Sequence, residues 1–199
     1  MNIKVLHIVG GLSDNGAFQG ANILHEALIK SKIKSKILSD MPISKKLNNL
    51  EKKEVVFINE NFFNRFLNKI FVFIEKLFKG IFLHSPRDTF NLCYFGFDIT
   101  KLEDYKDADI IHIHWLREGF ISLKSLSKIN KPVVWTMRDM WAFSGGPHYT
   151  LDFERYEKTF FSKIIKNYKM KNYNDNFNFV AVSKWLKDKA QKSNVLKNF

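Results

Sequence analysis

The chain has 199 residues, of which 45% are hydrophobic, and a formal net charge of +12 at pH 7. This length suggests one domain with a sizeable core. The single cysteine, Cys93, excludes an internal disulfide and argues against a cysteine-based metal site. No uncharged apolar stretch reaches the ~18 residues that a membrane-spanning helix needs, and MNIKVLHIVGG lacks the apolar region of a signal peptide. The basic balance favours acidic partners, which are phosphates, nucleic acid or anionic lipid.

The amino-terminal segment predicts a strand, a glycine-rich turn and a helix. Residues 3–9 are apolar and strand-like, Gly10, Gly11 and Gly16 follow, and residues 17–30 have helical spacing. Such a unit places backbone N–H groups and a helix N-terminus against phosphate. The alternative is a tight turn with no ligand. No acidic residue is well placed to bind a ribose, so a nicotinamide cofactor is not indicated.

Two further strands are predicted at residues 34–39 and 55–58, and Met41-Pro42 ends the first of them. The polar, basic residues 44–53 between them are expected to form an exposed loop or a short helix.

Residues 61–83 predict a long amphipathic helix. Its apolar side carries Phe63, Phe66, Leu67, Ile70, Ile74, Leu77, Phe78 and Ile81, and its other side carries Arg65, Lys69, Lys76 and Lys79. An apolar face opposite a basic face is typical of a helix that lies in a membrane interface. It is also typical of an ordinary helix that covers a sheet. Both interpretations are open on the sequence.

Residues 85–88 are expected to break this helix. The segments that follow are predicted as an extended stretch at 90–97, a helical turn at 102–105, a strand at 109–114 and a helix at 119–129. His112 and His114 are two residues apart in the predicted strand, so they point the same way. A metal pair is one interpretation, but no third ligand is evident nearby. The favoured interpretation is one structural imidazole and one at the end of the strand.

The central stretch is KPVVWTMRDMWAFSGGPHY, at 131–149. Pro132 suits the first position of a strand, and the apolar run after it is typical of a strand buried on both faces. Arg138 and Asp139 then place a cation and a carboxylate where ligands bind in open α/β sheets, outside the carboxyl end of a strand. Trp141 and Tyr149 add flat aromatic rings. Sugar sites need this combination of rings to stack on and polar groups that reach hydroxyls. A buried tryptophan loop without a ligand is the alternative.

The carboxyl-terminal part predicts a helix over 153–173, a strand over 177–182 and a helix over 184–192 with Ser183 as its N-cap. Strands that alternate with helices throughout predict an α/β fold with a Rossmann-like, doubly wound parallel sheet.

WTMRDMWAFSGGPHY resembles the WTLHDMWAFTGGCHY signature of the retaining glycosyltransferases of family 4, in the branch that builds colanic-acid-like, capsular and O-antigen polysaccharides. The glycine-rich turn, DIIHIHW at 109–115 and FVAVSKWLKDKAQKS at 179–193 also agree, so the resemblance runs from end to end. It implies that residues 1–199 are the single acceptor-side, N-terminal domain of a GT-B fold. The nucleotide-sugar domain of such an enzyme is then absent.

The resemblance implies transfer of a sugar from a nucleotide-diphosphate sugar to a glycan or lipid-linked oligosaccharide acceptor, without a metal or other cofactor. This isolated half is expected to be inactive. The implied reaction centre is His114, Arg138 and Asp139. The implied substrate contacts are Gly10, Gly11, Gly16, Trp115, Trp141 and Tyr149, and a core role for Trp141 is as well supported as a stacking one. The single cysteine fits a location in the reducing cytoplasm. The basic face of the 61–83 helix favours a peripheral position on the cytoplasmic membrane face, with anionic inner-membrane lipid as a partner.

Two departures from the signature stand out. Pro147 replaces a cysteine, and Arg138 replaces the histidine beside the reacting sugar. Arginine can only donate hydrogen bonds, so it either clamps an anionic group or marks a lost activity.

The alternative to an enzyme is a truncated, non-catalytic basic module that binds anionic membrane or nucleic acid. Nucleic acid is not expected, because aromatic and basic residues do not alternate on any predicted strand face.

Overall fold

The computed structural model describes residues 3–41, 54–82, 90–149 and 156–197, and these form a six-stranded sheet in the order β3-β2-β1-β4-β5-β6. All five strand pairs are parallel. This is the strand order of the Rossmann fold, so the predicted α/β fold class is confirmed. The strands are β1 (Lys4–Val9), β2 (Lys34–Ser39), β3 (Val55–Phe57), β4 (Ile110–Trp115), β5 (Val133–Met137) and β6 (Phe177–Ala181).

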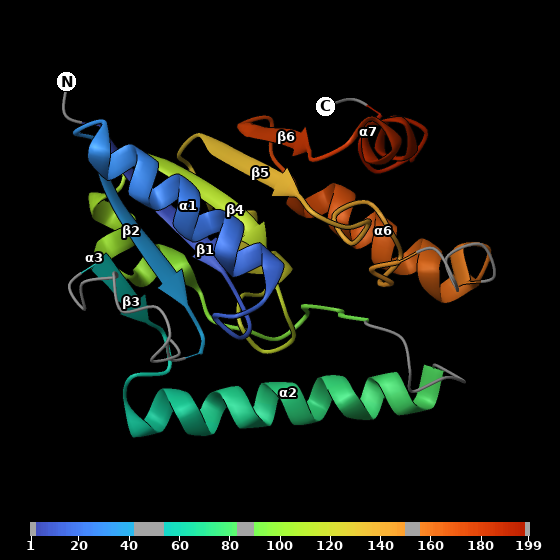
Figure 1. The fold of residues 1–199 in the computed structure, drawn as a ribbon. Coiled ribbons are helices and arrows are strands. Elements are labelled where there is room, and N and C mark those ends of the chain that lie inside the picture. Colours follow the sequence, from blue (N-terminus) through green and yellow to red (C-terminus); the bar gives the residue numbers. More distant parts are fainter. Residues whose placement is uncertain (1–2, 42–53, 83–89, 150–155, 198–199) are drawn as a thin grey trace.

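Helices cover both faces of the sheet (Figure 1). Helix α1 lies against one face, and α3 lies behind the sheet on the other. The helices are α1 (Gly16–Lys30), α2 (Phe62–Phe82), α3 (Glu103–Asp107), α4 (Leu123–Leu126), α6 (Phe160–Asn172) and α7 (Lys184–Gln191), with a 3-10 turn at Ile99–Lys101.

The two faces of the sheet are packed differently. Alternate strand residues such as Leu6, Ile8 and Ile113 point into the main apolar core, away from α1. On the α1 face, Val9 packs against Phe18 in a smaller cluster, and the middle of that face carries histidines in place of aliphatic side chains. A cluster of imidazoles therefore lies under α1.

The predicted strands agree with the observed ones to within two residues at each end. Predicted helices at the first glycine-rich turn and after Ser183 are also confirmed, and the Ser183 side chain accepts a hydrogen bond from the backbone N–H of Leu186 at 3.2 Å. The predicted turn at 102–105 is α3, shifted by one or two residues.

The helix predicted over 119–129 is wrong in length, because only Leu123–Leu126 is helical. Gly119 has a positive φ, and its carbonyl accepts a hydrogen bond from the Asn68 side chain. Ile121 forms an isolated bridge with Phe97. These tertiary contacts hold residues 119–121 outside helical geometry.

The segment predicted as an extended stretch, 90–97, contains no helix and no named strand; Phe90 and Phe97 form isolated bridges with Pro147 and Ile121. The helix predicted over 153–173 is α6, which begins later because the Thr159 hydroxyl caps it. Predictions for 44–53 and 85–88, and the start of the 153–173 prediction, lie outside the described residues.

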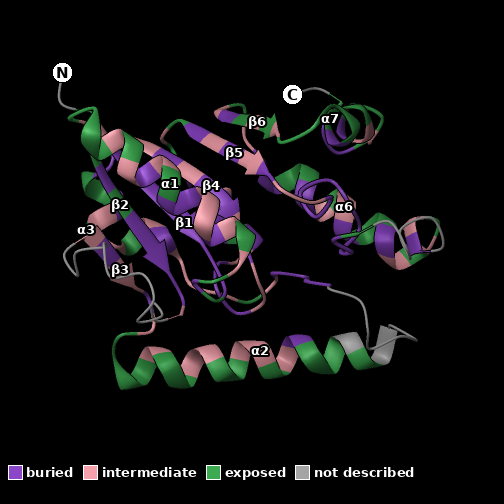
Figure 2. Cartoon of the chain, viewed as in Figure 1, coloured by how far each residue is buried: buried purple, intermediate pink, exposed green. Residues whose placement is uncertain are grey.

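The predicted 61–83 helix is confirmed as α2, but it does not bury its apolar face against the sheet. The side chains of Phe63 and Leu77 are 64% and 52% exposed. Exposed residues follow the side of α2 that faces away from the sheet (Figure 2). In the described part of the chain, no helix has both the length and the apolar character needed to cross a bilayer.

Candidate functional site

The carboxyl ends of β1, β4 and β5 bring the predicted site residues together. The Gly10 N–H donates to the Trp115 carbonyl at 2.9 Å, which joins the glycine-rich turn to the end of β4. The Trp115 ring packs on Gly11, where a Cβ atom would lie 2.8 Å from the ring. Arg138 and Asp139 follow the neighbouring strand β5 directly. The sheet thus assembles three separate sequence segments at one edge.

Asp139 is the centre of a buried hydrogen-bond cluster. Its Oδ2 accepts from Trp115 Nε1 at 3.0 Å and from His148 Nδ1 at 2.6 Å, and its Oδ1 accepts from the Trp141 backbone N–H at 2.9 Å. The His148 side chain is fully buried and that of Asp139 is 9% exposed. Burial raises the pKa of Asp139, but the bonds from His148, Trp141 and Trp115 outweigh it and lower the pKa overall.

Both oxygens of Asp139 are therefore used by protein donors. An ionised carboxylate only accepts, so His148 carries its proton on Nδ1. This arrangement makes Asp139 a group that positions Trp115 and His148 rather than a free base. His148 was part of the quoted motif but was not predicted as a site residue, because its contact with Asp139 depends on how the 140–148 loop closes.

Arg138 lies beside this cluster on the α1 face. Its Nη2 donates to His114 Nδ1 at 3.5 Å, and its guanidinium fills the space where a Cβ of Gly20 would be, 2.2 Å from Nη2. Its Nε is buried and has no hydrogen-bond partner among the described residues. Burial lowers the pKa of Arg138, and no carboxylate in the described part of the chain counteracts it. A half-buried guanidinium in this setting is suited to bind an anion.

His114 is buried beneath the edge, not open to it, with 2% of its surface exposed. Its ring stacks on His112, and its Nε2 lies 2.9 Å from Nδ1 of His7 on β1. Because arginine always donates, His114 must accept on Nδ1 and donate from Nε2 to His7. Burial lowers the pKa of His7 to about 3 and that of His112 to about 4, and it lowers the pKa of His114 further.

No third ligand near His112 and His114 is evident in the sequence, but the structure brings His7 beside them. Nitrogen atoms of the three rings lie within 4.8 Å of one another, and imidazoles are common metal ligands. However, a cation here would break the His7–His114 hydrogen bond and face the guanidinium of Arg138. The donor set is better explained as a neutral hydrogen-bonded relay that fixes Arg138.

An acidic residue, Asp40, lies at the carboxyl end of β2. This residue follows β2 directly, the place where dinucleotide folds carry the ribose-binding acid. Its carboxylate accepts from the Gly11 N–H at 2.8 Å and lies 3.5 Å from Arg117 Nε. Burial raises the pKa of the Asp40 carboxyl. The charge of Arg117 lowers it, but the effect of burial is larger. Asp40 is thus committed to the glycine-rich turn.

The remaining predicted substrate contacts differ in how far they are exposed to solvent. Tyr149 is 62% exposed at the rim and is free to stack on a ligand. Gly16 begins α1 in open space. Trp141 is 2% exposed; its Nε1 donates to the Asn91 carbonyl at 2.7 Å, and Lys169 Nζ lies 3.8 Å from its ring centroid. Of the two roles open for Trp141, the structure therefore supports the core one.

The glycine pair in the central motif has a packing requirement. A Cβ on Gly145 would lie 2.0 Å from Oγ and 2.7 Å from Cα of Ser162, on α6. We expect Gly145→Ala to reduce the free energy of unfolding by about 1–3 kcal/mol, because the backbone of α6 must move. Urea unfolding measures this loss.

Gly16→Ala is the matched control, since its Cβ meets nothing within 4 Å. Equal stability of Gly145→Ala and wild type would show that the loop and α6 are not in close contact.

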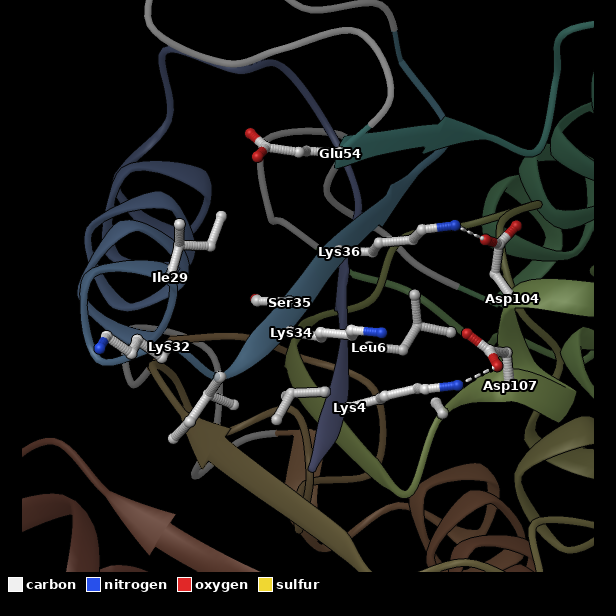
Figure 3. Close-up of a pocket in the computed structure, with 13 residues that line it drawn as sticks. Lys4, Leu6, Ile29, Lys32, Lys34, Ser35, Lys36, Glu54, Asp104 and Asp107 are labelled. Carbon is white, nitrogen blue, oxygen red and sulfur yellow. Dashed lines mark hydrogen bonds and ion pairs between the residues drawn. The ribbon is translucent and has the colours of Figure 1, made fainter. Parts of the chain in front are cut away.

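A separate cavity of about 550 Å³ opens at the opposite, amino edge of β1 and β2 (Figure 3). Two of its lysines, Lys4 and Lys36, are paired with Asp107 and Asp104. Ligands of open parallel sheets bind at the carboxyl edge, and the Arg138 guanidinium also lies there, so we place the candidate site at the carboxyl edge.

Comparison with known proteins gives no relatives: the chain matches no family model, no curated protein and no solved structure.

Proposed function

We propose that this chain is the acceptor-side domain of a retaining glycosyltransferase similar to those of family 4. The enzyme would transfer a sugar from a nucleotide-diphosphate sugar to a glycan or lipid-linked acceptor of a bacterial surface polysaccharide. A second, nucleotide-binding domain would supply most of the donor contacts, so the 199-residue chain alone is expected to fold without transferring sugar.

One observation carries the proposal: residues of three separate signature segments meet around Asp139. Trp115 comes from HIHW, Asp139 and His148 come from the long central motif, and the Trp115 ring rests on Gly11 of the first turn. The strand order brings the carboxyl ends of β1, β4 and β5 together, and the side chains that meet there are those of the quoted segments. The contacts place the signature residues at the edge where α/β enzymes bind ligands.

Within this proposal, Arg138 is the group that touches substrate. Its guanidinium has hydrogen-bond donors free for two parallel bonds to a phosphate or to a carboxylate-bearing sugar. It cannot accept a proton, so proton transfer must come from the substrate or from the second domain. His114 and Asp139 position the site, and the exposed Tyr149 offers a ring to the acceptor.

The test is transfer by the complete two-domain enzyme carrying Arg138→Ala or Arg138→His. If Arg138 clamps an anion, alanine should lower kcat/KM by about 10²–10³, the order found when one preorganised charge-stabilising donor is lost. Histidine should lower it less. A rise in activity with histidine would show that the arginine is a lesion. Turnover by the isolated chain would overturn the two-domain requirement.

Gly20→Ala is a matched variant that moves Arg138 without touching its chemistry. The new Cβ would displace the guanidinium, while alanine favours the helix by about 1 kcal/mol relative to glycine. We expect unchanged or raised stability together with reduced transfer. Full activity of this variant would mean that the guanidinium acts from a different position when substrate is bound.

A further inference from the structure

Helix α2 turns its apolar side outward. Phe66 and Phe73 are 53% and 61% exposed, and Phe63, Ile70 and Leu77 are also exposed. These positions follow one another at spacings of three and four residues, so they form a single stripe along the helix. The stripe lies on the side of α2 away from the sheet (Figure 2).

The side of α2 that meets the rest of the protein makes both aromatic and polar contacts. The Phe71 ring packs against the rings of Phe95 and Phe97. Asn64 Nδ2 donates to the Ile58 carbonyl at 2.7 Å, and Asn68 Nδ2 donates to the Gly119 carbonyl at 2.8 Å. The Glu75 carboxyl accepts from the Leu92 N–H at 3.2 Å. A helix that only covered a core would carry no second apolar face on its outer side. The aromatic and polar contacts together fix the orientation of α2 and leave the apolar stripe outside.

Cations accompany the stripe. Arg65, Lys69 and Lys76 are exposed on α2, and its one acid, Glu75, is 4% exposed. Two open grooves follow this flank. One, of about 440 Å³, is lined by Arg65 and Lys69. The other, of about 290 Å³, is lined by Lys69, Lys76 and Arg117.

We propose that α2 docks this protein on the surface of a bilayer rich in anionic phospholipid. The phenylalanine stripe enters the boundary between headgroups and acyl chains, and the cations of the flank bind lipid phosphates in the two grooves. An outward apolar face beside a purely cationic flank is the pattern of a helix lying in the membrane plane. With a net charge of +12, the whole chain is attracted to such a surface.

A second copy of the chain fits this face less well. Pairing two α2 helices would bring together like-charged flanks, which opposes association. A bilayer offers apolar depth and negative charge at once, and both features of α2 are satisfied. The docking does not depend on the proposed glycosyl transfer, since it uses no residue of the carboxyl-edge site other than Arg117.

The experiment is co-sedimentation of the 199-residue protein with vesicles of phosphatidylcholine, alone or with one quarter phosphatidylglycerol. We expect binding to the anionic vesicles only, weakening as salt is raised to roughly 0.5 M, because exposed charges are then screened. Lys69→Gln/Lys76→Gln should weaken binding about tenfold or more, since each cation near the surface is worth roughly a fivefold change. Phe66→Ser/Phe73→Ser should weaken it by a similar factor through lost apolar insertion.

The matched controls lie on α7, which is well separated from α2 (Figure 1). Trp185→Ser and Lys184→Gln/Lys187→Gln remove exposed apolar and cationic groups there and should leave binding unchanged. Equal losses in these controls, equal binding to neutral vesicles, or no binding at all would overturn the proposal. So would a dimer in sedimentation analysis that Phe66→Ser/Phe73→Ser dissolves, because a second copy would then be the occupant. Circular dichroism confirms that each variant is folded.

Discussion

Acidification from about pH 7.5 to about pH 5.5 is expected to lower the free energy of unfolding by about 3 kcal/mol, mainly through histidines buried under α1. His7 and His112 have their pKa values lowered by burial to about 3 and about 4, and the pKa of His114 is lowered as well. Their rings cannot take up a proton until the pH falls far below 6.5, whereas unfolded histidines protonate near 6.5. The unfolded state therefore binds more protons across this range and gains stability relative to the folded state.

The sign follows from which state binds protons. A histidine whose folded pKa is lowered contributes fully above its unfolded pKa, and the contribution falls by about 1.4 kcal/mol per pH unit below it. Burial lowers the pKa of His25, which lies opposite His7, in the same direction, against the attraction of Glu54. All four imidazoles thus act together.

Two other buried groups, Glu75 and Lys169, also contribute to the change in the free energy of unfolding between these pH values. Burial raises the pKa of Glu75 to about 7, so the folded state binds its proton first and gains stability on acidification. Burial lowers the pKa of Lys169 to about 7, so its unfolded state is already protonated and stability falls further. The gain at Glu75 is larger than the loss at Lys169, and together they offset about a quarter of the histidine effect.

Urea unfolding at the two pH values measures the change. His112→Asn should remove about 1.4 kcal/mol of the pH dependence, the contribution of one imidazole over one pH unit below 6.5. A free energy of unfolding that is equal at both pH values would show that these rings exchange protons freely in the folded protein.

The strands of this sheet could be predicted closely because their signal is local. Val133, Val134 and Trp135 form an apolar run after a proline, and the first strand ends at a glycine pair. The failures occurred where distant contacts decide the local geometry. Residues 119–121 are held outside helical geometry by their contacts with Asn68 and Phe97, and no pattern within 119–129 contains that information.

In the candidate site, too, the features that depend on local sequence could be predicted, and those that depend on distant contacts could not. Arg138, Asp139 and Trp115 could be placed at the sheet edge, because each follows or ends a recognisable strand. His7 and Asp40 were missed because their roles depend on which strands are neighbours: β1 pairs with β4 at His7–His112, and β2 ends beside the glycine-rich turn. The burial of Trp141 could not be predicted from the sequence either, because it depends on how the 140–148 loop and α6 pack around the ring.

Asp139→Ala is expected to lower the free energy of unfolding by about 3–5 kcal/mol, because three buried donors lose their acceptor and each costs about 1–3 kcal/mol when left unpaired. The change leaves the Trp115 indole N–H, the Trp141 backbone N–H and His148 without their acceptor in a closed pocket. Each abandoned group then bears its full desolvation cost. Trp115 also loses its link to the motif loop, so its fluorescence should shift toward that of a more exposed indole.

Asp139→Asn separates charge from shape. Its single carbonyl oxygen can satisfy one side of the cluster, and His148 can change tautomer to accept from the new amide. We therefore expect an intermediate loss of about 1–3 kcal/mol. Asp175→Ala, at an exposed position, is the matched control and should change stability by less than about 0.5 kcal/mol. If Asp139→Ala proved as mild as Asp175→Ala, the cluster would not organise this edge, and the convergence of signature residues around Asp139 would lose its physical meaning.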